Sequence, residues 1–180
     1  TATNASGSAS LRIPIGIFAR GWQNDGAIAL DFDLTTGQVQ PVLTGFKTND
    51  PVIVAQQDET LIIDLGFTQN SGQSLIPIYP SEIRIAIKLS DTDAEPLCLS
   101  DGNFEVLGSY QSTRYRILLP LTGDLLSAAI SDNEKDEVTV IKAFAEIRFL
   151  QPIEFNSEAR LIPRSSLTFP VQIGKALRPI

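Results

Sequence analysis

The segment Glu82-Ile83-Arg84-Ile85-Ala86-Ile87-Lys88-Leu89 decides the fold class, because its large apolar residues recur at every second position. Successive side chains of a β-strand point to opposite faces, so such a segment has one apolar face and one largely charged face. An α-helix would scatter the same four apolar residues around its axis. The segment therefore predicts a strand with one buried and one solvated face.

The same alternation recurs in residues 27–34 and 60–67. Clusters of Gly, Asn, Asp, Ser and Pro separate the further strand candidates, which are residues 38–46, 51–56, 104–108, 113–119, 137–150 and 158–163. In residues 137–150 the apolar parity changes near Val140 and Ile141, which indicates a bulge or burial on both faces. Only residues 123–130 have a helical pattern, with Thr122 as a candidate cap. Together these elements predict an all-β fold, an antiparallel β-sandwich with Greek-key or jelly-roll connections and one short helix.

Length and composition limit the possible domain organisation and the possible chemistry of the chain. The chain has 180 residues, a net charge of −7, one Cys and neither His nor Met. We expect a flexible polar tail at residues 1–10 and a single β-sandwich domain at residues 11–180. Without imidazole, catalytic triads that use His and His-ligated metal sites are excluded, and no cofactor is predicted. Cys98 lies among apolar residues and is interpreted as a small buried hydrophobe, with a reactive or intermolecular thiol as the alternative.

The acidic composition also bears on partners. The sequence contains no cluster of Lys and Arg, which direct binding of nucleic acid requires. It contains no apolar run of the length that crosses a membrane as a helix. We therefore expect neither direct contact with nucleic acid nor a transmembrane segment.

Two segments near the ends of the chain share one pattern. Residues 10–17 and 166–173 both read Ser, Leu, any residue, apolar, Pro, apolar, any residue, Ile. Proline donates no backbone hydrogen bond and is confined in sheets mainly to edges, ends and bulges. The segments are interpreted either as edge strands of one sandwich or as arms that complete the sheet of a neighbouring subunit, and chance similarity remains an alternative. The docking residues of such arms would be Leu11, Ile13, Ile15, Ile17, Leu167, Phe169, Val171 and Ile173.

Two loops are weaker candidates for ligand sites. Trp22, with Asn24 and Asp25, combines an aromatic face with polar groups that suit a sugar, although a turn capped by Trp explains the same residues. Asp91, Asp93 and Glu95 supply oxygen ligands that suit calcium, but Pro96 stands where an EF-hand needs Gly, so a solvated turn is the simpler interpretation.

Charged residues on strands give two further hypotheses. Arg114 and Arg116 would share one face of a strand, where they bind an anion or remain solvated. The pairs Asp31 with Asp33 and Glu146 with Glu154 are the carboxylates that a glycosidase would need.

The leading functional hypothesis is a non-enzymatic structural subunit, a component of a virion, a fibre or another surface structure. It would self-associate through strand edges or terminal arms, as a homo-oligomer or with other structural subunits. The alternative is a ligand-binding module of the carbohydrate type that uses the Trp22 loop, with calcium as a possible aid. A virion or cell-surface assembly is favoured over a free cytoplasmic enzyme.

Overall fold

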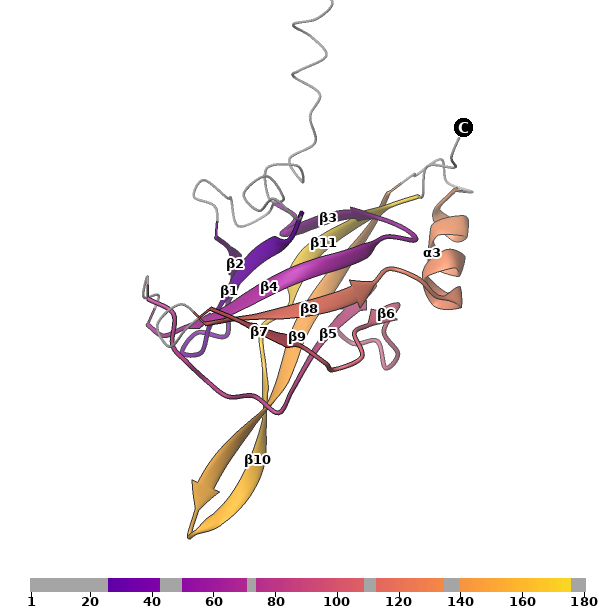
Figure 1. Cartoon of the computed structure of the whole chain (residues 1–180). Helices are drawn as coiled ribbons and strands as arrows, with labels where there is room; N and C mark the ends of the chain where they lie inside the picture. The colour runs from indigo at the N-terminus through magenta and orange to yellow at the C-terminus, as the bar shows by residue number, and fades with distance from the viewer. Residues whose placement is uncertain (1–25, 43–49, 71–73, 109–112, 135–139, 176–180) are drawn as a thin grey trace, which may run out of the picture.

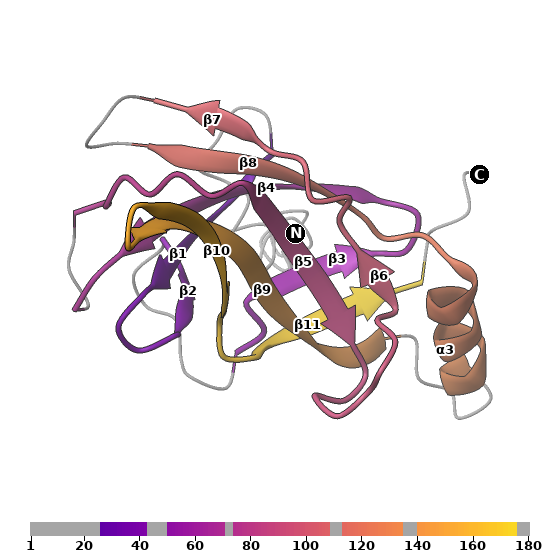
Figure 2. The same cartoon turned by 90° about the horizontal axis from the view of Figure 1, so that it is seen from below.

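The computed structural model describes residues 26–42, 50–70, 74–108, 113–134 and 140–175. In these residues the chain forms two β-sheets packed face to face, with one helix at the end of the sandwich (Figure 1). Figure 2 shows the same two layers after a quarter turn. The prediction of an all-β sandwich with one short helix is confirmed.

The first sheet has the order β2–β1–β4–β8–β7. Its strands are β2 (Val39–Pro41), β1 (Ile28–Asp33), β4 (Thr60–Thr68), β8 (Arg114–Pro120) and β7 (Glu105–Leu107). The second sheet has the order β3–β11–β9–β5–β6, and β10 also pairs with β9. Its strands are β3 (Ile53–Gln56), β11 (Phe169–Gly174), β9 (Val140–Phe155), β5 (Glu82–Lys88), β6 (Cys98–Leu99) and β10 (Glu158–Ser165). The helix, α3 (Asp124–Glu134), follows β8 and extends beyond the predicted residues 123–130.

Both sheets are mixed, which corrects the prediction of purely antiparallel pairing. β1 runs parallel to β4, and β11 runs parallel to β3. Alternation of apolar residues indicates which face a strand buries but carries no information on the direction of its neighbour. The connection from β1 to β4 contains β2 and β3 and is therefore long enough to return the chain for parallel pairing.

One apolar core fills the space between the sheets. Ile83, Ile85 and Ile87 of the segment 82–89 are fully buried, whereas Leu89 lies beyond the end of β5 and is 43% exposed. The ring of Phe67 lies at the centre of the core, 4.9 Å between centroids from Phe149 in the opposite sheet. These aromatic contacts join the two layers directly.

A one-residue bulge separates β10 from β11. Both strands pair with the same edge of β9, but Ser165 is opposite Arg148 and Phe169 is opposite Ala145, so three residues face two. Inside the bulge, the backbone N–H of Leu167 donates to the carbonyl of Gly37 in the turn between β1 and β2, at 2.7 Å. The bulge thus ties the second sheet to the first. The parity change predicted near Val140 depends on Val138, which lies outside the described residues.

Ser166 holds this bulge against β9. Its backbone N–H donates to the carbonyl of Ile147 at 2.8 Å, and its Oγ accepts from the N–H of Ile147 at 2.9 Å. On the other side, Ser100 Oγ accepts from the N–H of Ile85, the direct partner of Ile147. Two buried serines therefore satisfy the central pair of the sheet from both edges.

Replacing Ser166 by alanine is expected to lower the free energy of unfolding by about 1–3 kcal/mol, because the buried N–H of Ile147 loses its acceptor. Urea unfolding monitored by circular dichroism measures the change. The control is Ser165→Ala, one residue away and exposed, for which a change within about 0.5 kcal/mol is expected. Equal effects of the two substitutions would contradict the assigned role of Ser166.

Candidate functional site

The hairpin formed by β9 and β10 projects from the sandwich (Figure 1). β9 pairs with β5 as far as Leu150, opposite Glu82, and its residues 151–155 then pair with β10 alone. Asn156 and Ser157 form the connection, with φ angles of 52° and 61°. Positive φ at both central residues is the requirement of a type I′ turn, whose twist matches that of the strands. The result is a two-stranded arm that leaves the body of the fold.

One face of this arm is apolar and open to solvent. The outer face of the second sheet continues along the hairpin through alternate residues of β9 and their partners on β10. Leu161 on this face is 55% exposed, and Leu150 at its base is half-buried. We call this face the apolar strip; its residues are Leu150, Pro152, Ala159, Leu161 and Pro163.

The opposite face of the arm carries Phe155, which is 52% exposed but has contacts of its own. The guanidinium of Arg160 lies 5.2 Å from the centre of the Phe155 ring. The same Arg160 forms an ion pair with Glu158 at 3.2 Å. On this face Arg160 therefore covers part of the Phe155 ring, whereas in the described residues no charged side chain covers the apolar strip in this way.

Two prolines protect the edges of the arm. Pro152 pairs with Leu161, and Pro163 pairs with Leu150. In the register set by the two-residue turn, both are non-hydrogen-bonded pairs, in which the backbone N–H and C=O groups point away from the partner strand. The carbonyl of Leu150, the partner of Pro163, indeed points outward and accepts from the N–H of Ser81 at 2.9 Å. Each edge thus lacks a donor where an added strand would need one. A partner can cover the face of the arm more readily than it can extend its edges.

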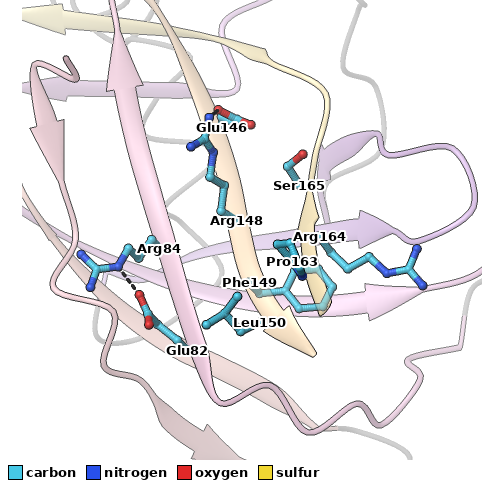
Figure 3. A pocket seen from close by; sticks show the side chains of 9 residues that line it. All are labelled: Glu82, Arg84, Glu146, Arg148, Phe149, Leu150, Pro163, Arg164 and Ser165. Carbon is cyan, nitrogen blue, oxygen red and sulfur yellow. Dashed lines mark hydrogen bonds and ion pairs between the residues drawn. The ribbon is translucent and has the colours of Figure 1, made fainter. Parts of the chain in front are cut away.

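A groove lies where the arm leaves the sheet (Figure 3). Its volume is about 460 Å³, and it is lined by Glu82, Arg84, Glu146, Arg148, Phe149, Leu150, Pro163, Arg164 and Ser165. Arg84 is directly opposite Arg148 on the neighbouring strand, an arrangement of like charges that costs stability unless it is compensated. Each arginine forms an ion pair with a glutamate two residues earlier on its own strand, Glu82 and Glu146 respectively. The interaction with Glu146 raises the pKa of Arg148.

No protein-family model, curated protein or solved structure matches this chain.

The C-terminal arm of the sequence hypothesis lies inside the fold. Phe169, Val171 and Ile173 are buried in the core of their own chain, between β3 and β9. The interpretation of this segment as an edge strand is wrong, because β11 has a neighbour on both sides. Pro170 is accommodated because it precedes the first pair with β3, and its carbonyl still accepts from the N–H of Val52. Of the four predicted residues only Leu167, in the bulge, is exposed.

Several predicted sites lie outside the described residues. These are the N-terminal tail, the N-terminal arm with Leu11, Ile13, Ile15 and Ile17, and the candidate sugar loop with Trp22, Asn24 and Asp25. No geometry supports the carbohydrate alternative, since the loop that carries it is not described.

The calcium candidate is not supported where the structure describes it. Asp93 turns back and accepts the backbone N–H of Ser90 at 2.8 Å, so its carboxylate closes the turn after β5. Asp91 and Glu95 do not join it, and the described residues contain no group of three or more carboxylate or thiol side chains able to hold a metal ion. The acidic pattern is therefore that of a solvated turn.

Arg114 and Arg116 lie on one face of β8, as predicted, but each binds an aspartate of the same sheet. Arg114 Nη2 lies 2.7 Å from Asp31 Oδ1, and Arg116 forms two hydrogen bonds of 2.8 Å with Asp64. The arginines therefore neutralise carboxylates within the sheet.

The carboxylates proposed for a glycosidase either have other partners or lie far apart. Asp31 binds Arg114, whereas Asp33 accepts the backbone N–H of Thr35 at 2.8 Å and closes the turn after β1. Glu146 and Glu154 are eight residues apart on one strand, roughly 25 Å, which is far beyond the separation that such chemistry uses.

Cys98 is buried on β6, as predicted from its apolar neighbours. Burial raises the pKa of its thiol to about 11, so the reactive thiolate is scarce at neutral pH. In the described residues no helix is both long and apolar enough to cross a lipid bilayer.

The sequence interpretation missed the hairpin. It ended one strand at residue 150 and began the next at 158, because Pro152 and the Asn-Ser pair indicated a loop. The available signal is the Asn-Ser pair flanked by two segments of similar length, with Pro152 four residues before Asn156 and Pro163 six residues after Ser157.

Proposed function

We propose that this chain is a non-enzymatic structural subunit that self-associates through the β9–β10 hairpin. The observation that carries the proposal is the apolar strip, a set of exposed apolar side chains on an arm that projects from an otherwise complete sandwich. An isolated two-stranded hairpin is marginally stable in water, and contact with a partner supplies the missing burial. A virion, a fibre or another surface structure is the setting we propose, since such assemblies repeat one contact between copies.

The blocked edges define the kind of contact. Pro152 and Pro163 disfavour addition of a strand to either edge of the arm. Association through the face of the arm therefore replaces the contact between strand edges that the sequence suggested. The N-terminal arm, residues 10–17, remains a second proposed route.

Replacing Leu161 by aspartate is expected to abolish self-association without unfolding the chain. Light scattering from about 10 to 500 µM covers the affinities expected of small interfaces, and the mass of the natural chain should rise above 19.5 kDa with concentration. The variant should remain at 19.5 kDa, because a charge within the strip must lose its water on contact.

The matched control is Leu118→Asp on β8, since Leu118 is 53% exposed on the other sheet. It should associate as the natural chain does. Deletion of residues 1–19 tests the N-terminal arm by the same measurement. If that deletion dissociates the chain and Leu161→Asp does not, the hairpin is not the docking element; a monomeric natural chain would contradict self-association altogether.

A further inference from the structure

The charges on the hairpin are arranged around its own centre. Along the outer face of β9, the residues are Arg148, Leu150, Pro152 and Glu154, so a basic base and an acidic tip enclose two apolar residues. The centre of this series is residue 151, and residue 151 pairs with residue 162 of β10. On β10 the centre of the pair Pro163 and Leu161 is also residue 162. Both strands of the apolar strip therefore share one midpoint.

The two charged ends are accessible. The side chain of Arg148 is 59% exposed, and its bond of 2.8 Å to Glu146 uses one of its five N–H donors. Glu154 is exposed near the turn. Within the described ranges no cation lies at ion-pair distance from Glu154. Arg148 therefore has N–H groups that can donate to a partner, and the carboxylate of Glu154 can accept from one.

From this pattern we propose that the partner of the hairpin is a second copy of the chain, related by a two-fold axis that lies between the two apolar strips and crosses the strands at the level of the Gln151–Ile162 pair. The inference rests on the function proposed above and specifies its contact. The two hairpins lie antiparallel, with one apolar strip against the other. Because Arg148 and Glu154 are six residues apart, about 20 Å, and equidistant from the axis, Glu154 of each copy meets Arg148 of the other.

Self-complementarity selects a second copy over an unrelated partner. A two-fold contact requires one surface to match itself in reverse order, which this series of basic, apolar, apolar and acidic residues does. The groove at the base, bounded by Arg84, Arg148 and Leu150, gives the acidic tip of the other hairpin a place to enter. Arg84, directly opposite Arg148, adds a second guanidinium there, and each of the two also pairs with a glutamate that lines the groove, Glu82 or Glu146.

The contact is small. The two strands of the hairpin together are about 10 Å wide, and the strip is about 20 Å long, so each copy covers roughly 200 Å² of the other in projection. This area is well below that of a standard stable interface. We therefore expect micromolar or weaker association that falls as salt is added, because the ion pairs lie at the rim.

A charge exchange tests this geometry. Arg148→Glu places two pairs of glutamates against each other in the two-fold contact, and Glu154→Arg places two pairs of arginines. Each single variant should self-associate at least about tenfold more weakly than the natural chain, because like charges meet twice. A mixture of the two variants restores opposite charges at both positions and should associate within about threefold of the natural affinity. Sedimentation velocity on the full chains at low salt measures all three.

The control is Arg160→Glu on the opposite face of the hairpin, which gives the same net charge as Arg148→Glu, −7 − 2 = −9. It should associate nearly as the natural chain does, and far-UV circular dichroism confirms that every variant is folded. If the two single variants associate normally, or if their mixture is no stronger than either alone, the two-fold contact is wrong. Should Leu161→Asp still dissociate the chain in that case, the proposed function stands while this geometry falls.

Discussion

Replacing Phe67 by alanine is expected to lower the free energy of unfolding by about 3–5 kcal/mol, the usual cost of removing a buried aromatic ring. Phe67 is fully buried on β4. Its ring centroid lies 5.7 Å from that of Phe32, 5.6 Å from that of Tyr115 and 4.9 Å from that of Phe149. These rings come from four strands in both sheets, so the neighbours cannot close the cavity without moving the sheets.

Guanidinium unfolding of the natural chain and the variant measures this loss. The matched control is Phe144→Ala on β9, the same substitution at a ring that is 42% exposed on the outer face, with an expected cost below about 1 kcal/mol. A loss at Phe67 no larger than that at Phe144 would contradict the central position of the ring. Since the natural stability of a domain is only about 5–15 kcal/mol, the Phe67 variant should also be the more sensitive to proteolysis.

The alternation of apolar residues was enough to predict the layers of the fold. Ile83, Ile85 and Ile87 are buried because period two matches the pleat of a strand. The parallel pairing of β1 with β4 could not be predicted in this way, because both directions bury the same face. Leu89 broke the pattern only because the strand ends before it.

Prolines misled the interpretation twice, and for the same reason. Pro170 suggested an edge strand, and Pro152 suggested a loop, since each lacks a backbone donor. In the structure both occupy positions where their neighbours require no donor: the end of the β3 ladder for Pro170 and the outer edge of the hairpin for Pro152. Which side of a strand a residue's backbone faces depends on register, and register depends on partners that are distant in the sequence.

The charged pairs show the same limit. Their spacing predicted that Arg114 and Arg116 share one face, which the structure confirms. Their partners, Asp31 and Asp64, are 83 and 52 residues away. Sequence spacing therefore located the cations but could not show that the fold had already neutralised them.

Asp64→Ala is expected to lower the free energy of unfolding by about 2–4 kcal/mol. Asp64 is 2% exposed and accepts two hydrogen bonds from Arg116, through Nε and Nη2. Removing one member of a buried ion pair leaves the other charge without its compensation, at a cost of about 3–5 kcal/mol when both are buried. The Arg116 side chain is 25% exposed, so water recovers part of that cost. Urea unfolding at constant salt measures the change.

Asp31→Ala provides the graded comparison. The Asp31 side chain is 31% exposed and accepts one hydrogen bond of 2.7 Å from Nη2 of Arg114, so its removal should cost about 1 kcal/mol. A larger loss at Asp31 than at Asp64 would show that burial does not determine the strength of these pairs.

The double variant Asp64→Leu with Arg116→Met separates the value of the ion pair from the cost of breaking it. Replacing both charges by apolar side chains of similar size removes the desolvation penalty together with the attraction, and such replacements are often neutral. We therefore expect the double variant to regain most of the stability that Asp64→Ala loses. A double variant as unstable as Asp64→Ala would mean that the pair itself stabilises the sheet. Recovery would instead show that the pair contributes little net stability, and that Asp64→Ala is costly because it leaves the charge of Arg116 without its partner.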